Sequence, residues 1–266
     1  MKSAFVPSID CHAHIYTREM LLAPDAWHRP EGEAGLEQLS EQLQAAGVGR
    51  CVLAAASIYG DNNDYALAAC AADQRLRTTV IVRPGTGVEA LRVMREAGAV
   101  GIRLQLRNKP LPDLRSTGFR GLLRAAADLG WHVELHDDLH RLPPLIRELE
   151  CQGMPVVVDH FGRPSTMDDL NGDDFGALLA AVDRGRCWIK ISAGFRLASA
   201  ALARAASDRL LTSCGTARLL WGSDWPFAAF EGRVDYSQAL ADFAQQVPVA
   251  LQRAEMDRTG NAFYFS

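Results

Sequence analysis

The feature that most constrains the fold is an alternation of two hydrophobic patterns along the whole chain. Short runs rich in β-branched residues predict strands, and apolar residues spaced three and four apart between them predict amphipathic helices. Eight strands are predicted: Ser8–His14, Arg50–Ala56, Thr78–Val82, Val100–Leu104, Trp131–His136, Pro155–His160, Cys187–Ser192 and Arg218–Ser223. The helical stretches include Leu36–Ala46, Val88–Ala97, Gly121–Leu129, Leu142–Cys151, Phe175–Val182 and Ala200–Ser213. Such alternation is typical of an α/β protein with a parallel sheet.

The number of strands and the length of the chain select among parallel architectures. Eight strand–helix units in 266 residues predict a (β/α)8 TIM barrel that forms a single domain over residues 1–266. An open doubly wound sheet would place a glycine-rich turn after the first strand, where this chain has His12-Ala13-His14. Glycines after the helical stretches predict left-handed helix ends, and these are Gly47, Gly98, Gly130, Gly153 and Gly215. Residues 238–257 predict closing helices.

Composition excludes several classes of partner. The formal net charge is -4, and no basic stripe is present that would bind nucleic acid or a membrane surface. No apolar run reaches the length of a membrane span, and the start of the chain leads directly into a strand without a signal-peptide pattern. The six cysteines form no Cys-x-x-Cys pair, which predicts reduced thiols in a cytoplasmic protein. Apolar Leu21, Leu22 and Trp27 favour a lid or a contact between copies, so a homo-oligomer stays open.

Polar side chains gather where the predicted strands end, and barrel enzymes place their chemistry at this end. His12 and His14 lie two residues apart in the first strand, so their rings face the same side. The later strand ends contribute Arg103, His136, His160, Ser192 and Asp224, with Arg196 in the loop beyond the seventh strand. Buried polar groups need partners, so this convergence indicates one shared site rather than ordinary packing.

Six short segments carry a resemblance to a known family. They are Asp10-Cys11-His12-Ala13-His14, Ser57-Ile58-Tyr59-Gly60-Asp61-Asn62, Val158-Asp159-His160-Phe161-Gly162-Arg163-Pro164, Lys190-Ile191-Ser192-Ala193-Gly194-Phe195-Arg196, Trp221-Gly222-Ser223-Asp224-Trp225-Pro226 and Gly260-Asn261-Ala262-Phe263-Tyr264. In this order they resemble the amidohydrolase superfamily. More narrowly, they resemble its amidohydrolase-2 branch, which contains the 2-pyrone-4,6-dicarboxylate lactonases and related sugar-acid and muconolactone lactonases.

The resemblance implies a hydrolase that opens the ester bond of a carboxylated lactone. Asp224 would be the general base that takes a proton from the attacking water. His12, His14 and His160 would polarise the lactone carbonyl or orient this base. The substrate-binding residues implied are Arg103, Arg163, Arg196, Ser57 and His136. These residue types suit the chemistry, because ester hydrolysis needs an activated water and a stabilised oxyanion, and guanidinium groups pair with carboxylates.

The chain departs from the pyrone lactonases at positions that bear on substrate and cofactor. His136 stands where those lactonases carry tyrosine, and Phe227-Ala228 stands where they usually carry His-Pro. A second arginine is expected shortly after Arg103, and either Arg107 or Lys109 could serve. These changes put the pyrone dicarboxylate itself in doubt and leave a lactone or a related small-molecule carboxylate as the expected substrate class.

His136 also opens the question of a metal. Mononuclear members of the superfamily hold one divalent ion, often zinc, with a set that corresponds here to His12, His14, His136 and Asp224. The pyrone lactonases, by resemblance, work without a metal. The sequence leaves both alternatives open: no cofactor, or one divalent metal with zinc preferred.

Rival functions follow from the same residues. A zinc-dependent decarboxylase of an aromatic or muconate acid is slightly favoured by His136, whereas the arginines and the Ser57 segment favour a lactonase. An isomerase of a sugar-acid lactone would use the same carboxylate as a proton shuttle. Separately, Glu134 and Lys190 point inward deeper in their strands, and we predict a buried ion pair between them.

Overall fold

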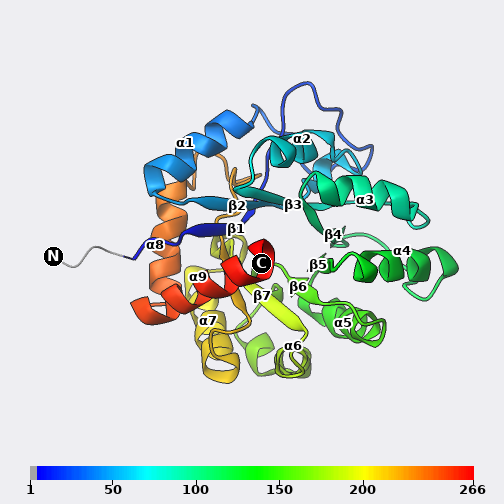
Figure 1. Ribbon diagram of the computed structural model, residues 1–266. Coiled ribbons are helices and arrows are strands. Elements are labelled where there is room, and N and C mark those ends of the chain that lie inside the picture. The colour runs from blue at the N-terminus through cyan, green and yellow to red at the C-terminus, as the bar shows by residue number, and fades with distance from the viewer. Residues whose placement is uncertain (1–4) are drawn as a thin grey trace.

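The computed structural model describes residues 5–266, so the first four residues of the predicted domain lie outside the described residues. Eight parallel strands pair in chain order and form the predicted (β/α)8 barrel, with helices around the outside (Figure 1). The strands are β1 (Ile9–Ala13), β2 (Arg50–Leu53), β3 (Leu76–Val80), β4 (Ala99–Gln105), β5 (His132–His136), β6 (Val156–Val158), β7 (Cys187–Ser192) and β8 (Leu219–Gly222).

The barrel closes between its first and last strands at their carboxyl ends. The amide of Asp224 donates to the His12 carbonyl at 2.8 Å, and the amide of His14 donates to the Trp225 carbonyl at 2.7 Å. Both bonds join the residues just beyond β8 to the end of β1. The closure therefore brings the two predicted catalytic segments into direct contact.

The helices occupy the stretches between the strands. They are α1 (Leu36–Ala46), α2 (Asp64–Ala72), α3 (Val88–Glu96), α4 (Thr117–Asp128), α5 (Leu142–Cys151), α6 (Asp173–Asp183), α7 (Ala200–Cys214), α8 (Tyr236–Gln246) and α9 (Ala250–Phe265). The five glycines predicted at helix ends all have positive φ, a conformation that glycine adopts without steric cost. The last two helices are the predicted closing helices.

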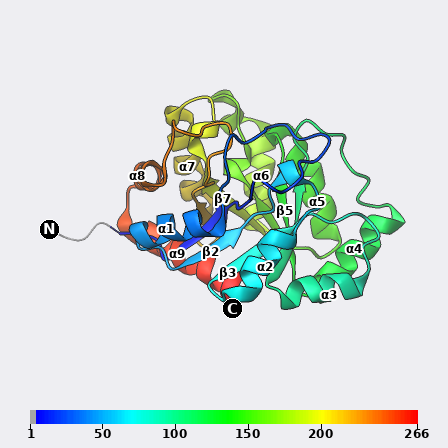
Figure 2. The same cartoon turned by 90° about the horizontal axis from the view of Figure 1, so that it is seen from above.

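The two ends of the barrel are closed differently. Helix α9 lies across the end shown in front in Figure 1, and its Phe263 and Tyr264 pack against His132 at the start of β5. The loops that follow the strands lie at the opposite end, where Figure 2 shows the dark-blue segment after β1 running over the strands. This open end holds the pocket described below. No helix within residues 5–266 is long and apolar enough to cross a membrane.

Some strands are shorter than the sequence predicts, and this matters for the site. His14 lies one residue beyond β1, and His160 lies two residues beyond β6. His160 and Phe161 have φ values of 52° and 61°, in the left-handed region, so the chain turns sharply there. The turn, rather than the strand itself, directs the His160 ring toward the pocket.

Candidate active site

A pocket of about 450 Å³ lies at the carboxyl ends of the strands. Of the nine side chains that the sequence predicts for the site, eight line this pocket: His14, Ser57, Arg103, His136, His160, Arg163, Arg196 and Asp224. The exception is His12, which is fully buried beneath the others. At this depth His12 is placed to orient the predicted base, Asp224, and not to contact a substrate carbonyl directly.

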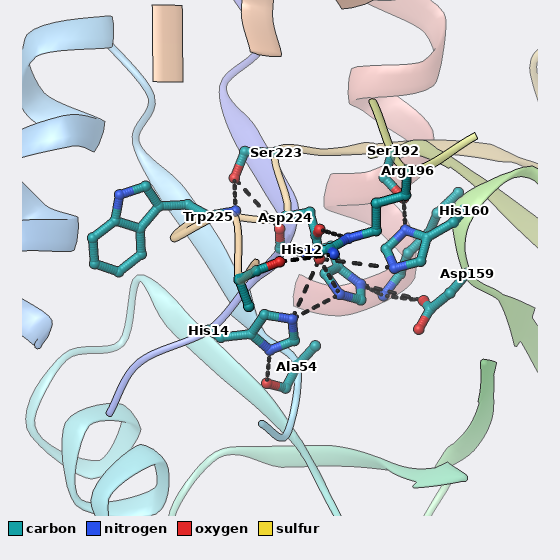
Figure 3. A network of polar contacts seen from close by, with 12 residues as sticks. His12, His14, Ala54, Asp159, His160, Ser192, Arg196, Ser223, Asp224 and Trp225 are labelled. Carbon is teal, nitrogen blue, oxygen red and sulfur yellow. Dashed lines mark hydrogen bonds and ion pairs between the residues drawn. The ribbon is translucent and has the colours of Figure 1, made fainter. Parts of the chain in front are cut away.

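Asp224 lies at the floor of the pocket, and its side chain is surrounded by positive and polar groups (Figure 3). Its Oδ1 lies 3.4 Å from Nε2 of both His12 and His14, and its Oδ2 accepts a hydrogen bond from Arg196 Nε at 2.6 Å. Burial would raise the pKa of Asp224, but Arg196 and the histidines, His160 foremost, outweigh burial and hold the pKa well below its ordinary value. Asp224 is therefore a carboxylate at neutral pH.

A second aspartate, Asp10, fixes the backbone that presents this carboxylate. Its Oδ1 accepts hydrogen bonds from the amides of His12 and Ser223 at 3.0 Å and 2.9 Å, and its Oδ2 accepts one from the Tyr236 hydroxyl at 2.9 Å. Asp10 thus joins β1, the end of β8 and α8 at the barrel seam. Asp10 belongs to the first sequence motif, but no local signal there predicts its role at the seam.

The partners of the pocket histidines bear on which ring nitrogen carries hydrogen. Nδ1 of His14 lies 2.7 Å from the Ala54 carbonyl, which can only accept, so this nitrogen donates and Nε2 of a neutral ring is bare. His160 Nδ1 lies 2.9 Å from Ser192 Oγ. Burial lowers the pKa of His14, and it lowers the pKa of His136 and His160 well below the usual range, so these three rings are neutral at pH 7.

His136 is distinctive because its Nε2 is buried and has no hydrogen-bond partner among the described residues. The ring lines the pocket beside His160, with the ring centroids 5.0 Å apart. An unpartnered buried polar atom is costly, and a ligand that hydrogen-bonds to it relieves that cost. His136 is therefore placed to select among substrates.

Four charged side chains form a buried cluster below the pocket: Arg103, Glu134, Asp159 and Lys190. The predicted ion pair is confirmed, with Lys190 Nζ 2.5 Å from Glu134 Oε2. Arg103 lies 2.8 Å from Glu134 Oε1 and 2.9 Å from Asp159 Oδ2, and it also donates to the Ala55 carbonyl at 2.8 Å. The hydrogen bonds of Arg103 to Asp159 and Ala55 engage three of the five N–H donors of its guanidinium, so two remain for the predicted contact with a substrate carboxylate.

The other arginines are better placed for a ligand. Arg163 and Arg107 lie 3.4 Å and 3.0 Å from the same oxygen of Asp138, and both line the pocket. Arg107 and Lys109 were the two candidates for the second cation expected after Arg103. Arg107 shares Asp138 with Arg163, whereas Lys109 forms an ion pair with Asp25 at 2.8 Å. Two guanidinium groups thus share one counterion at the pocket wall.

The predicted zinc set is only partly assembled. Ligand atoms of His12, His14 and Asp224 lie within 4.8 Å of one another, but His136 belongs to no such group among residues 5–266. Nε2 of His12 could bind an ion only if Nδ1 carried the hydrogen of the neutral ring, and Lys190 Nζ lies 2.9 Å from that Nδ1. Arg196 further occupies Asp224. The residues present therefore do not fit a divalent ion well.

Nε2 of His12 carries a hydrogen whether the ring is protonated or neutral. Burial and Lys190 act to lower the pKa of His12, but Asp159 and Asp224 outweigh them, and the net shift is upward. A protonated ring carries hydrogen on both nitrogens, and a neutral ring that accepts from Lys190 carries its hydrogen on Nε2. In both states Nε2 is a donor to Asp224 or to the bare Nε2 of His14, 3.3 Å away.

The whole chain is similar to known proteins. The family described as Amidohydrolase matches residues 9–261. A 4-sulfomuconolactone hydrolase from Hydrogenophaga intermedia is 24% identical over 250 residues, which cover 89% of this chain and 82% of the relative. Among solved structures, a Pseudomonas putida protein described as a 2-pyrone-4,6-dicarboxylic acid hydrolase is 34% identical, with a TM-score of 0.90 and 98% of each chain covered. An Acinetobacter baumannii structure with the same description and bound citric acid is 27% identical, with a TM-score of 0.92 over 97% of this chain and 99% of that chain.

Proposed function

This chain belongs to the amidohydrolase family, and from that membership we propose that it is a hydrolase that opens a carboxylated lactone. The observation that carries the proposal is the buried Asp224 carboxylate, held ionised at the floor of a pocket whose wall presents unpaired positive charge. A fixed base next to a cationic binding surface is what hydrolysis of an anionic ester requires.

Asp224 activates the water in this proposal. A water that lies between Asp224 and the lactone carbonyl gives its proton to the carboxylate as its oxygen attacks the carbonyl carbon. The tetrahedral intermediate then collapses, the ring C–O bond breaks, and Asp224 returns the proton to the leaving oxygen. The products are a hydroxyl or keto group and a carboxylic acid, which releases its proton to solvent and becomes a carboxylate, and no reactant other than water is consumed.

The oxyanion needs a donor on the pocket side. If the Ser192 hydroxyl donates to Nδ1 of His160, the hydrogen of the neutral ring lies on Nε2, which is 3.8 Å from Asp224 Oδ1. That N–H is then close to both the base and the reacting carbonyl. His14 is less suited to this role, because Nε2 of its neutral ring is bare.

The proposed substrate class is a lactone that bears at least one further carboxylate. Arg107 and Arg163 share Asp138 and retain one net positive charge, which a substrate carboxylate would neutralise. Bound citric acid in the Acinetobacter baumannii relative supports a pocket for carboxylates in this family. His136 in place of tyrosine supports a lactone that differs from the pyrone dicarboxylate.

We infer that the reaction needs no metal and that the enzyme is cytoplasmic. The contacts of Lys190 with His12 and of Arg196 with Asp224 support the first inference, and they weaken the alternative of a zinc-dependent decarboxylase. The six free cysteines support the second, because thiols persist in reducing compartments. Neither nucleic acid nor a membrane is expected as a partner.

The substitution Asp224→Asn tests the role of the base. Turnover of a carboxylated lactone should fall about 1000-fold, because an amide cannot accept the proton, while circular dichroism stays unchanged. The assay measures loss of the lactone chromophore and release of carbon dioxide on 2-pyrone-4,6-dicarboxylate and on a muconolactone. Asp174→Asn, an exposed change on α6, is the control.

A loss of less than tenfold in Asp224→Asn would contradict the proposed base. Carbon dioxide release without ring opening would instead support the decarboxylase. Conversion of the lactone to an isomer of equal mass, seen by mass spectrometry, would support the isomerase.

A further inference from the structure

Lys190 is a buried ammonium that the proposed reaction does not use. It lies in β7, has no exposed surface, and contacts Nδ1 of His12, a member of the group that could hold a metal. We propose that Lys190 keeps divalent metal ions out of the His12–His14–Asp224 group by holding a hydrogen on Nε2 of His12. The inference deepens the proposed function, because it gives this chain's own reason for metal-independent hydrolysis.

The close contacts of Lys190 show which of its partners accept hydrogen bonds. An ammonium has three donors and no lone pair, so each of its close contacts must be an acceptor. Its Nζ lies 2.5 Å from Glu134 Oε2, 3.3 Å from Asp159 Oδ1 and 2.9 Å from His12 Nδ1. The contacts with Glu134 and His12 have the geometry of hydrogen bonds, whereas Asp159 Oδ1 forms an ion pair with Nζ without a hydrogen bond. In this arrangement the neutral His12 ring accepts at Nδ1.

The charges around Lys190 determine whether it keeps its proton. Glu134 and Asp159 carry two negative charges, and Lys190 and Arg103 carry two positive charges, so the cluster is balanced. Loss of the Lys190 proton would leave the two carboxylates with a single buried cation. The cluster therefore keeps Lys190 as an ammonium and a donor.

The rings of His12 and His14 face each other through their Nε2 atoms. His14 donates from Nδ1 to the Ala54 carbonyl, so its Nε2 is bare, 3.3 Å from Nε2 of His12. A hydrogen on Nε2 of His12 satisfies this pair without an ion. A metal would require both Nε2 atoms to be bare, with the His12 hydrogen moved to Nδ1 and donated to Asp159 Oδ1 at 3.2 Å.

Moving the His12 hydrogen from Nε2 to Nδ1 has an energetic cost. With the hydrogen on Nδ1, a Lys190 N–H and a His12 N–H would face each other across 2.9 Å. The Lys190–His12 hydrogen bond is lost in that arrangement, and the positive charge of Lys190 adds to that of the incoming ion. Without Lys190, Asp159 alone would orient His12, which is the carboxylate–histidine arrangement common in metal sites.

The test compares two charge-balanced double variants. Lys190→Met with Glu134→Gln removes the contact with His12, whereas Arg103→Met with Glu134→Gln removes a cation of the same cluster that does not contact His12. Each protein and the unsubstituted chain are incubated with zinc, passed through gel filtration and analysed for metal. We expect the Lys190 variant to bind zinc at least about tenfold more tightly than the other two proteins, the size of effect typical of a group bonded to a ligand histidine.

Three results would overturn the proposal: a folded Lys190 variant that takes up no zinc, equal uptake by the Arg103 variant, or stoichiometric zinc in the unsubstituted chain. Adding Asp224→Asn to the Lys190 variant should abolish the uptake, and uptake that persists would place the zinc elsewhere and also count against the proposal. None of these readouts needs turnover, so they fail or succeed independently of the lactonase proposal.

A second measurement needs no substitution. Nitrogen-15 NMR of the histidine rings in the unsubstituted protein reports which nitrogen carries hydrogen. We expect the His12 resonances to show a hydrogen on Nε2. A bare Nε2 with hydrogen on Nδ1 would refute the proposal even if both double variants fail to fold.

Discussion

At the scale of single residues, two arginines with one shared counterion mark where a substrate carboxylate would bind. Arg107 and Arg163 both contact Asp138 Oδ1. Burial and the neighbouring Arg107 lower the pKa of Arg163, although Asp138 acts in the opposite direction. The pair is thus short of one anion, and an arriving carboxylate would supply it.

We predict that Arg163→Met raises the KM for a carboxylated lactone by about 10- to 100-fold, the worth of one charge-assisted hydrogen bond. The change in kcat should be much smaller, because the Arg163 guanidinium pairs with Asp138, and only the backbone amide of Arg163, which the substitution keeps, bonds to His160. Steady-state kinetics separate the two parameters. Arg184→Met, which removes an arginine paired with Glu150 on the outer surface, serves as the control. An unchanged KM would contradict the assigned role.

The sequence predicted which residues meet at the site but not how deep each one lies. The eight predicted residues that line the pocket lie in strands or in the loops beyond their carboxyl ends, as their positions along the chain predict. Strand alternation gives the face of a side chain within a strand, such as Arg103 or His136. It does not give the distance from solvent, so the burial of His12 and the engagement of Arg103 were not predictable. The contact between Lys190 and His12 joins residues 178 positions apart, and no local signal specifies it.

At the scale of elements, the loop over residues 14–35 covers one side of the pocket mouth and is fastened at several points. Its contacts are a bridge between Tyr16 and Ala34, an ion pair of Asp25 with Lys109, a hydrogen bond from Trp27 to Ser57, and a contact of His28 with Glu231. Trp27 lines the pocket yet is 52% exposed. The position of this loop is therefore consistent with a lid, one of the two alternatives that its apolar residues favoured.

We predict that Trp27→Ala raises KM several-fold, about the effect of losing an apolar contact of 1–2 kcal/mol, while the melting temperature stays unchanged. The physical reason is that a half-exposed side chain adds little to stability but can cover a bound ligand. Leu21→Ala is the matched control, because Leu21 lies in the same loop, is 84% exposed and does not line the pocket. Equal KM values for both variants would argue against a lid.

Elements with a periodic pattern were predictable, whereas the turn after β6 was not. The glycines at 47, 98, 130, 153 and 215 ended helices as predicted, since each has positive φ. The strand predicted as Pro155–His160 ends at Val158 instead. His160 and Phe161 adopt positive φ without being glycine, and tertiary contacts such as that of His160 with Ser192 hold them there.

At the scale of the whole molecule, buried neutral histidines make stability depend on pH. Burial lowers the pKa of His132 to about 4, and it also lowers those of His136 and His160. An unfolded histidine titrates near 6.5, so below that pH the unfolded chain binds protons that the folded chain does not. The stabilising difference is complete above pH 6.5 and is lost as the pH falls toward 4.

We predict that the free energy of unfolding falls between pH 7 and pH 5, by about 2 kcal/mol from His132 alone. The aspartates with lowered pKa values, Asp159 and Asp224, remain charged in this range and do not contribute to the loss. Urea unfolding at the two pH values measures the difference. In His132→Gln the difference should shrink by that amount, and an unchanged difference would assign the pH dependence to other groups.

The architecture of the whole molecule was the most predictable level. Eight strands in 266 residues leave few parallel alternatives, and the observed strand order follows the chain without exception. Barrel closure then brings distant segments together without any specific signal for each pair. The position of α9 across the far end was not predicted, because α9 has little amphipathic periodicity and its sequence therefore does not mark which face is buried.

The seam between β1 and β8 has a consequence for how the enzyme is made. His12 and His14 lie far ahead of Asp224 in the chain, yet they meet only where the barrel closes. A nascent chain therefore holds the histidines long before it holds the base, and no partly synthesised form can hydrolyse substrate. Circular permutants that place new termini in an outer loop between His14 and Asp224, and join the two ends of this chain, would reverse this order of synthesis while leaving the same seam to close.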